Sequence, residues 1–304
     1  MPGTGNPTNM PDPMTPPPVT LPGYAIPNIE TAQTRVGGTA PTSMAETAIV
    51  AAIQSRADAA DTFEFSDFGP TANSVSITCM NNSSCSGSVD DVGTLTFSLT
   101  GIDDLSLVVE TGLMDFVSNT QAVMMDEGVT MIQSQAAAGQ EDGTRLSFQS
   151  YGGWITNTVF GVERLDVLEA GETTTRYASF SFGDASGSNP TGTGTLQWTG
   201  VMVGTDTTTG DVIQGDINIS DIIATPNDLD QINFLNVKNL NTGRDVTFNN
   251  VNTLQFVGLT LTNGSFASAN GEVKGSFYGM NHEEAGGILN SGTYNLIGAF
   301  GAKK

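Results

Sequence analysis

Positive charge is scarce in this sequence. Ten Lys and Arg residues stand against 32 Asp and Glu residues, which gives a net charge of −22. A surface this acidic repels the phosphates of nucleic acids and the headgroups of anionic lipids. The imbalance therefore argues against a nucleic-acid-binding protein and against a basic patch on a membrane. It favours solubility, and it leaves open a cationic partner or ligand.

Histidine is almost absent, since the chain has only His282, in the stretch "NHEE" with Glu283 and Glu284. A metal site needs three or four converging ligands, and consecutive residues on a strand or turn point in different directions. A hydrolase triad has no base here, and no phosphate-binding G-x-x-x-x-G-K-[ST] loop is present. We expect no enzyme and no bound metal, with His282 an isolated surface side chain in a hairpin turn. A metal or haem ligand is the alternative for His282, and catalysis by carboxylates alone stays open.

Only two cysteines are present, Cys79 and Cys85, and no histidine or second cysteine pair completes a metal site with them. The run between them is polar and turn-forming. We therefore predict a disulfide that closes a short loop, which is typical of an oxidising compartment. Two reduced thiols in a cytosolic protein are the alternative. No run of 18 or more apolar residues exists, so the sequence predicts no membrane-spanning helix.

The first 40 residues lack the basic and apolar regions of a secretory signal. Nine of the 13 prolines lie between Pro2 and Pro27. We predict that residues 1–40 form a disordered, extended tether, with a terminus of no function as the alternative. Either export uses another route, or an upstream signal has been removed and Met1 is a new start. We favour the second explanation.

Residues 41–144 are predicted to form a helix followed by a small β-rich domain. Ser43 and Glu46 make a capping box at the start of an apolar helical pattern over residues 42–61. From Thr62 onward the apolar pattern alternates with a period of two, as in strands. The methionines of this region either fill gaps in a core or provide an adaptable surface for a partner. The candidate partner-binding residues are Met114, Met124, Met125 and Met131.

Residues 145–304 contain many short alternating strands separated by turn residues, with no helix between them. Glycines recur on faces that also carry large apolar residues, as in the stretch from Leu196 to Gly204, which suits a strongly curved sheet. We predict a mainly β protein with an eight-stranded antiparallel β-barrel over residues 145–304. If Trp198, Phe277 and Phe300 point inward, they fill the barrel and argue against a lipocalin-like carrier.

The last 30 residues resemble the C-terminal hairpin of the transferrin-binding protein B family of bacterial surface lipoproteins. That hairpin has the form G-x-F-Y-G-P-x-x-x-E-x-G-G, followed by G-x-F-G-A-K/R. The matching residues are Gly275, Phe277, Tyr278, Gly279, Glu284, Gly286 and Gly287, then Gly298, Phe300, Gly301, Ala302 and Lys303. Residues 177–221 and 234–266 also resemble the solute-binding branch of this family. Met280 replaces the usual proline, and no lipid-accepting cysteine precedes Cys79.

The resemblance implies a smaller handle domain before the barrel and a binding protein without catalytic activity. Family membership implies capture of a host protein, haem or another iron source for uptake, with an outer-membrane transporter as a further partner. It also implies a lipid-anchored position on the bacterial outer membrane, or secretion if the anchor is missing. A surface adhesion barrel with no nutrient ligand is the alternative function.

Overall fold

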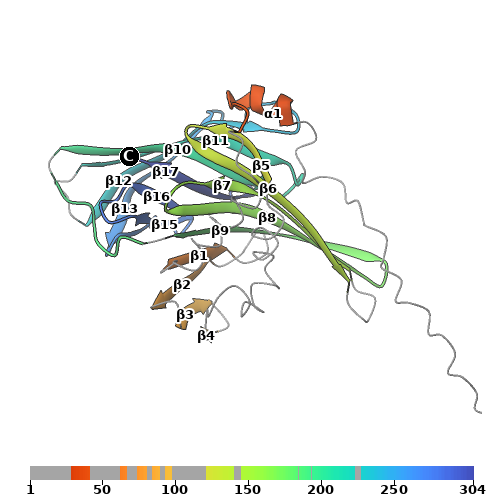
Figure 1. The fold of residues 1–304 in the computed structure, drawn as a ribbon, viewed down its shortest axis with the longest axis horizontal. Coiled ribbons are helices and arrows are strands. Elements are labelled where there is room, and N and C mark those ends of the chain that lie inside the picture. The colour runs from red at the N-terminus through yellow and green to blue at the C-terminus, as the bar shows by residue number, and fades with distance from the viewer. Residues whose placement is uncertain are drawn as a thin grey trace, which may run out of the picture.

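The structure is a computed structural model, and it describes residues 29–41, 62–66, 74–80, 84–89, 93–97, 121–139, 145–183, 185–192, 194–222 and 227–304. Within these residues, strands form a nine-stranded sheet and a closed barrel (Figure 1). The prediction of a mainly β protein with an eight-stranded antiparallel barrel at its C-terminal end is confirmed. No helix in the described part of the chain is both long enough and apolar enough to cross a membrane.

The sheet has the strand order β4-β3-β2-β1-β9-β8-β7-β6-β5, and its neighbouring strands are antiparallel. Its first four strands are β1 (Thr62–Ser66), β2 (Ser74–Met80), β3 (Ser84–Val89) and β4 (Gly93–Phe97). The other five are β5 (Gln121–Asp126), β6 (Val129–Gly139), β7 (Arg145–Trp154), β8 (Thr158–Glu169) and β9 (Glu172–Gly183). The pairing of β1 with β9 joins these two groups of hairpins into one sheet.

The barrel is built from the last eight strands in chain order, and β17 closes it by pairing with β10. Its strands are β10 (Thr195–Asp206), β11 (Val212–Ile222), β12 (Asp228–Asn239), β13 (Thr253–Thr262), β14 (Ser265–Ala267), β15 (Val273–Tyr278), β16 (Glu284–Ser291) and β17 (Leu296–Lys303). The barrel therefore begins at Thr195 and not at residue 145. Strands β7 to β9 belong to the sheet, because their pairing continues to β6 on one side and to β1 on the other.

The barrel interior is packed with large side chains. Trp198, Phe277 and Phe300 are fully buried and belong to one apolar cluster with residues of all eight strands. The ring centroids of Trp198 and Phe277 lie 4.8 Å apart, and those of Phe234 and Phe300 lie 5.5 Å apart. The three residues point inward, which meets the condition set out from the sequence, so the interior is a packed core.

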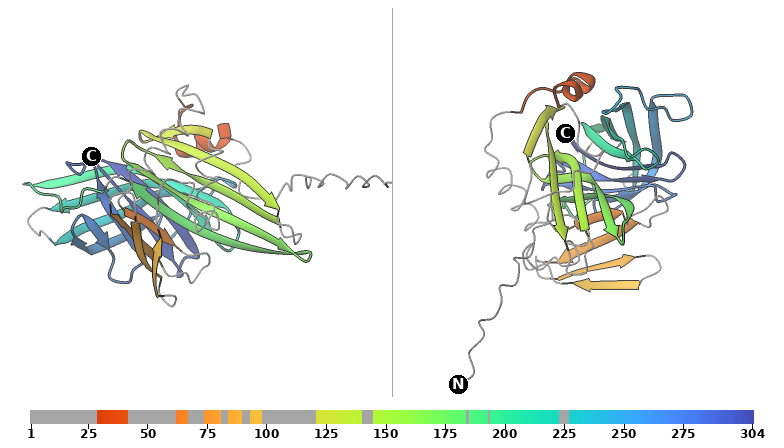
Figure 2. Two further views of the ribbon diagram at one scale, coloured as in Figure 1. Left: turned by 60° about the horizontal axis from the view of Figure 1, so that its bottom comes forward. Right: turned by 90° about the vertical axis from the view of Figure 1, so that its right-hand side faces the viewer.

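The sheet packs against one side of the barrel, and its long strands extend beyond the barrel in Figure 2. A second apolar cluster joins Tyr151, Phe160 and Val162 of the sheet to barrel residues that include Val201 and Ala299. These barrel residues alternate with the inward-facing ones along β10 and β17, because successive strand residues point to opposite faces. The barrel wall thus contributes to two cores, one on each side.

The described helix is α1 (Ile29–Val36), which lies within the predicted tether. Over these residues a helix replaces the expected extended chain, because the run of prolines ends at Pro27. The Gln33 side chain donates to the carbonyl of Val123, 2.9 Å away, and Thr39 pairs with Met125, so this segment covers the edge of β5. Residues 1–28 and the helix predicted over residues 42–61 lie outside the described residues.

The backbone register of β2 and β3 places Cys79 directly opposite Cys85. Such a cross-strand position brings two residues close together. The disulfide between them stays a prediction.

Candidate functional site

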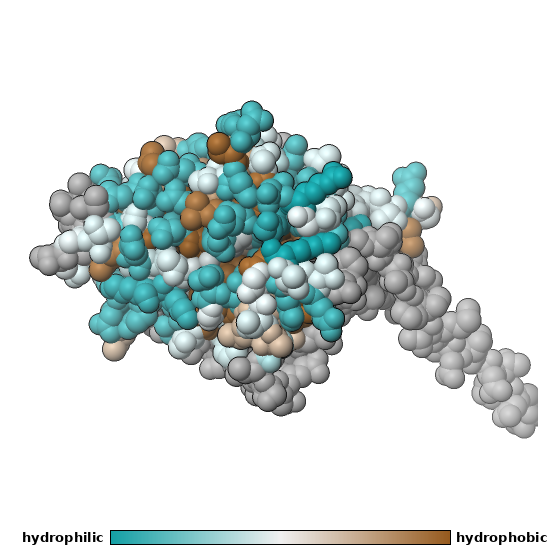
Figure 3. All heavy atoms as spheres, turned by 90° about the horizontal axis from the view of Figure 1, so that it is seen from above, coloured by the Kyte–Doolittle hydropathy of each residue, from teal (hydrophilic) through white to brown (hydrophobic). Residues whose placement is uncertain are grey.

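Four turns at one end of the barrel form a rim, which we define as residues 206–211, 239–245, 249–251 and 292–295. Most of these residues are exposed or partly exposed, whereas Gly210 and Leu240 are buried. The turns connect the ends of β10, β12 and β16 to the strands that follow. Figure 3 shows the face of the molecule that carries α1, where hydrophobic residues occur only in small groups among polar ones. A rim of this kind is the part of a filled barrel that is best placed to touch a partner.

Two of the rim turns share one design. The side chain of Asp206 accepts from the backbone N–H of Thr208 at 2.8 Å, and the side chain of Asn239 accepts from that of Thr242, also at 2.8 Å. The backbone N–H of Gly210 donates to the carbonyl of Asp206, and that of Gly243 donates to the carbonyl of Asn239. Both glycines have φ near +75°. Asp and Asn stabilise such turns through their own side chains, and glycine adopts this φ without strain.

Hydrogen bonds also tie the rim turns to one another. Asn239 donates to the carboxylate of Asp211 at 2.7 Å, and Thr207 donates to the carbonyl of Asn295 at 2.8 Å through its backbone N–H. The Asn249 side chain donates to the Tyr294 hydroxyl at 2.8 Å. The rim is therefore held in one arrangement before any partner binds, which lowers the entropic cost of binding.

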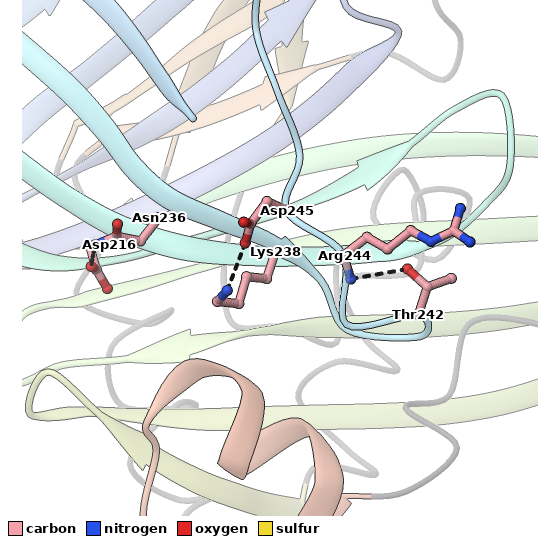
Figure 4. A network of polar contacts seen from close by, with 6 residues as sticks. All are labelled: Asp216, Asn236, Lys238, Thr242, Arg244 and Asp245. Carbon is pink, nitrogen blue, oxygen red and sulfur yellow. Dashed lines mark hydrogen bonds and ion pairs between the residues drawn. The ribbon is translucent and has the colours of Figure 1, made fainter. Parts of the chain in front are cut away.

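A group of polar residues extends from the rim along β11 and β12 (Figure 4). Lys238 forms an ion pair with Asp245 at 2.7 Å, and Asn236 donates to Asp216 at 2.6 Å. The Arg244 side chain points away from the Lys238–Asp245 pair and is exposed. Arginine side chains in such positions often anchor protein interfaces.

The opposite end of the barrel is crossed by residues 185–192. Nε2 of His282 lies 2.8 Å from the carbonyl oxygen of Ser188, so the imidazole donates this hydrogen bond. The carbonyl of His282 accepts from the indole of Trp198 at 2.7 Å, and its ring packs edge-on against Phe277. His282 is in a hairpin turn as predicted, but it is 9 % exposed and is no isolated surface side chain. Among the described residues, no group of three or more metal-ligating side chains occurs.

The glycines of the C-terminal motif serve both faces of the barrel wall. A Cβ at Gly287 would lie 2.7 Å from the Phe300 ring inside the barrel. A Cβ at Gly301 would lie 2.3 Å from the Phe160 ring of the sheet, and one at Gly286 would lie 2.6 Å from Thr158. Real side-chain atoms do not approach this closely, so glycine is required for the sheet to pack where it does.

Two polar residues of the motif also contact the sheet. The Glu284 carboxylate accepts from the backbone N–H of Asn157 at 2.8 Å and from its side chain at 3.3 Å. Tyr278 is fully buried, and its hydroxyl lies 3.4 Å from that of Ser181. The terminal motif therefore specifies both the end of the barrel and the surface on which the sheet lies.

A buried polar chain crosses the same interface near β11. The Tyr151 hydroxyl donates to the side-chain oxygen of Gln214, and the amide of Gln214 donates to Asp126 at 2.6 Å. Burial raises the pKa of Asp126, and the hydrogen bond from Gln214 opposes this effect. Burial also raises the pKa of Tyr151 well above its ordinary value, so its hydroxyl stays protonated.

A second buried carboxyl group lies in the barrel wall. Asp221 pairs with Leu196, which packs against the barrel core. Burial and the nearby Asp230 raise the pKa of Asp221 to about 6. Within the described part of the chain, Oδ1 of Asp221 is buried and has no hydrogen-bond partner. An alternating strand pattern does not predict that the side chain of Asp221, near the end of β11, is buried.

The methionines suggested as a contact surface lie elsewhere. Met124 and Met131 are fully buried between the sheet and the barrel, where they fill gaps beside Val129 and cannot reach a partner in this arrangement. Met125 is partly buried, and its sulfur lies 3.2 Å from the Thr130 hydroxyl. Met114 lies outside the described residues. The rim turns are rich in Asp, Asn, Thr and Gly, which indicate turns in a sequence but do not indicate which turns meet at one end of a barrel.

Comparisons with known proteins fit this architecture. Residues 193–304 match the family model described as the C-lobe and N-lobe beta barrels of Tf-binding protein B. The match covers the whole described barrel, including the terminal motif. Among curated proteins, none matches this chain.

Solved structures similar to the chain include intact Ap-TbpB with its N and C lobes, at 12 % identity over 75 % of this chain and 54 % of that one, with a TM-score of 0.30. The N-lobe domain of lactoferrin binding protein B of Moraxella bovis is similar at 11 % identity over 80 % and 98 %, with a TM-score of 0.32. The chain spans about half the length of intact Ap-TbpB. Over residues 193–304, the family match and the terminal motif together show that the C-terminal barrel is similar to the barrels of Tf-binding protein B.

Proposed function

We propose that this chain is a non-enzymatic cell-surface binding protein that captures a host protein of the transferrin or lactoferrin type. The match of residues 193–304 to the Tf-binding protein B barrels carries this proposal. The filled barrel interior supports it, because a partner has to bind on the outside. Haem is a second ligand that the same role in iron acquisition suggests.

The rim is the surface that we propose for the partner. Its turns are mostly exposed and tied together, and Arg244 offers a guanidinium to an acidic group of the partner. The high net negative charge of the chain favours a partner whose remaining contact surface is basic. We further propose a lipid anchor or secretion at the bacterial outer membrane, a transporter that receives the iron, and the Cys79–Cys85 disulfide.

Binding of immobilised protein to iron-loaded transferrin, lactoferrin and serum albumin tests the proposal. We expect saturable binding to one of the first two and none to albumin. Arg244→Ala should weaken binding about tenfold, as expected for an interface arginine. The matched variant Lys304→Ala, at the other end of the barrel, should bind like the unmodified chain. Absence of binding to both iron carriers, together with no spectral change on titration with haem, would refute iron capture.

An adhesion function is the second candidate. Aromatic residues make up only 7 % of the chain, whereas tight protein interfaces favour tyrosine and tryptophan anchors. A weak surface adhesin needs fewer such anchors. Binding to host cells or matrix components in the absence of binding to iron carriers would favour this function.

A further inference from the structure

One side of the barrel wall is incompletely paired. β13 pairs with β12 along its length, from Thr253 to Thr260. On its other edge it pairs with β14 only at Thr260, Leu261 and Thr262. Within the described residues, no backbone hydrogen bond from another strand reaches residues 253–259 on that edge. We call this edge of residues 253–259 the open edge; β12 and β13 lie side by side in Figure 1.

The cause is the early end of β14. Ser268 bonds to Val273 through its backbone N–H at 2.9 Å, and Gly271 donates to the carbonyl of Ser268 at 2.9 Å. Gly271 has φ +72°, and Asn270 bonds to both Ser268 and Glu272. This turn reverses the chain after Ala267, so β14 cannot continue along β13.

The apolar side chains on the outer face beside the open edge are exposed, whereas those on its inner face are buried in the barrel core. Leu254 and Phe256 are the most exposed members of the barrel core, at 8 % and 9 %. On the outer face, Val257 is 68 % exposed, and Val251 in the preceding turn is 56 % exposed. Two of the three large exposed apolar side chains identified in the described chain therefore lie at or next to this edge.

The region also lacks charge and proline, two of the features that normally protect an edge. No charged residue and no proline occurs between Asp245 and Glu272, in a chain with net charge −22. Natural edge strands are usually shielded by charge, proline or a covering segment. An unpaired row of backbone donors and acceptors is matched only by another extended backbone.

We propose that the open edge binds an extended, uncharged segment of a partner polypeptide, which adds to the barrel as a strand beside β13. Apolar side chains of that segment would pack against Val257 on the outer face, and backbone hydrogen bonds would provide the affinity. A second copy of this chain fits less well, because two bodies with net charge −22 repel each other. This proposal does not depend on the partner proposed for the rim, although Val251 belongs to the rim and also lies next to the open edge.

The probe is a seven-residue peptide with blocked ends in which valine and threonine alternate. Its binding to the protein is measured by fluorescence anisotropy. We expect saturable binding and slower amide hydrogen exchange over residues 253–259. The same peptide with N-methyl groups at alternate residues should not bind, because it lacks the donors. Val257→Lys should weaken binding by at least about tenfold, since charge on an edge opposes strand addition. Thr262→Lys is the matched control, with the same charge on the same strand where β14 already occupies the edge.

Three results would overturn the proposal. The first is no saturable binding, and the second is equal weakening by both lysine variants. The third is a dimer in sedimentation experiments that Val257→Lys dissociates, because a second copy would then occupy the edge. Both substituted side chains are solvent-exposed, so the variants should fold, and the thermal unfolding of each checks this.

Discussion

The two faces of the barrel wall are packed by different means. Inside, rings such as Phe300 and Phe266 fill the space and meet glycines of neighbouring strands. Outside, where the sheet lies, the packing combines glycines with buried hydrogen bonds such as those of Glu284 and Gln214. Packing on the inner face depends on the volume of the buried side chains. Packing on the outer face depends on close backbone approach at glycines and on the positions of hydrogen-bonding groups. Different substitutions should therefore damage each of them.

The largest effect should come from removing volume inside. Phe300→Ala should lower the free energy of unfolding by about 3–5 kcal/mol, because it leaves a cavity in a fully buried site. Phe300→Leu, which leaves a smaller cavity, should cost clearly less. Chemical denaturation of both variants measures the difference. Equal losses for the two variants would contradict a role of Phe300 in filling volume.

Adding volume outside should come next. Gly301→Val should lower the free energy of unfolding by up to about 3 kcal/mol, because its side chain would collide with Phe160. Replacing Phe160 by Ala in the same chain should recover part of that loss. A double-mutant cycle measured by denaturation tests this, and strictly additive losses would show that the two residues are not coupled.

The buried carboxyl groups should make the stability of the barrel wall depend on pH. Asp221 has a folded-state pKa of about 6, above its ordinary value near 4, so the folded state holds the proton more tightly. Its contribution to stability is present below about pH 4, decreases between about pH 4 and about pH 6, and is lost above that.

Asp221→Asn should abolish this decrease. Asp126→Asn should change the pH dependence less, because Gln214 already donates to the carboxylate of Asp126. Thermal unfolding of both variants from pH 4 to pH 7 makes the measurement. A profile for Asp221→Asn that still decreases over this range would assign the effect to another group.

The smallest effect should be at the rim. Asn239→Ala removes side-chain bonds to two backbone N–H groups and to Asp211, and it should cost about 1 kcal/mol. Asn239→Ser keeps an acceptor for these N–H groups without placing a second carboxylate beside Asp211, and it should restore part of the loss. If Asn239→Ala leaves stability unchanged but weakens partner binding, the order of the rim matters for recognition alone.

Local patterns predicted the barrel strands and turns well. In β10 the alternation of Trp198, Gly200 and Met202 correctly indicated an inward face, and glycines at positions 210 and 243 indicated the turns. The membership of β7 to β9 was predicted wrongly, because consecutive hairpins look alike in sequence. Their sheet is decided by the pairing of β1 with β9, which joins residues far apart in the chain.

For a related reason, the sequence did not predict the burial of His282 and left open whether Met124 is buried or exposed. A turn residue is normally exposed, but residues 185–192 cross this turn and cover the imidazole. Met124 is covered by the barrel, and a strand pattern does not show which of its faces meets a second domain. Contacts between distant segments thus set the accessibility of both residues, and accessibility decides what a site can do.

The closure of the barrel by β10 and β17 has a consequence for the order of folding. All other neighbouring barrel strands are consecutive in the chain, whereas Thr199 pairs with Lys303 across about a hundred residues. The docking surface of the sheet contains Val201 from β10 and Ala299 from β17, so it is complete only after this last pairing forms. We expect the sheet to attach late in refolding, after a slow ring-closing step.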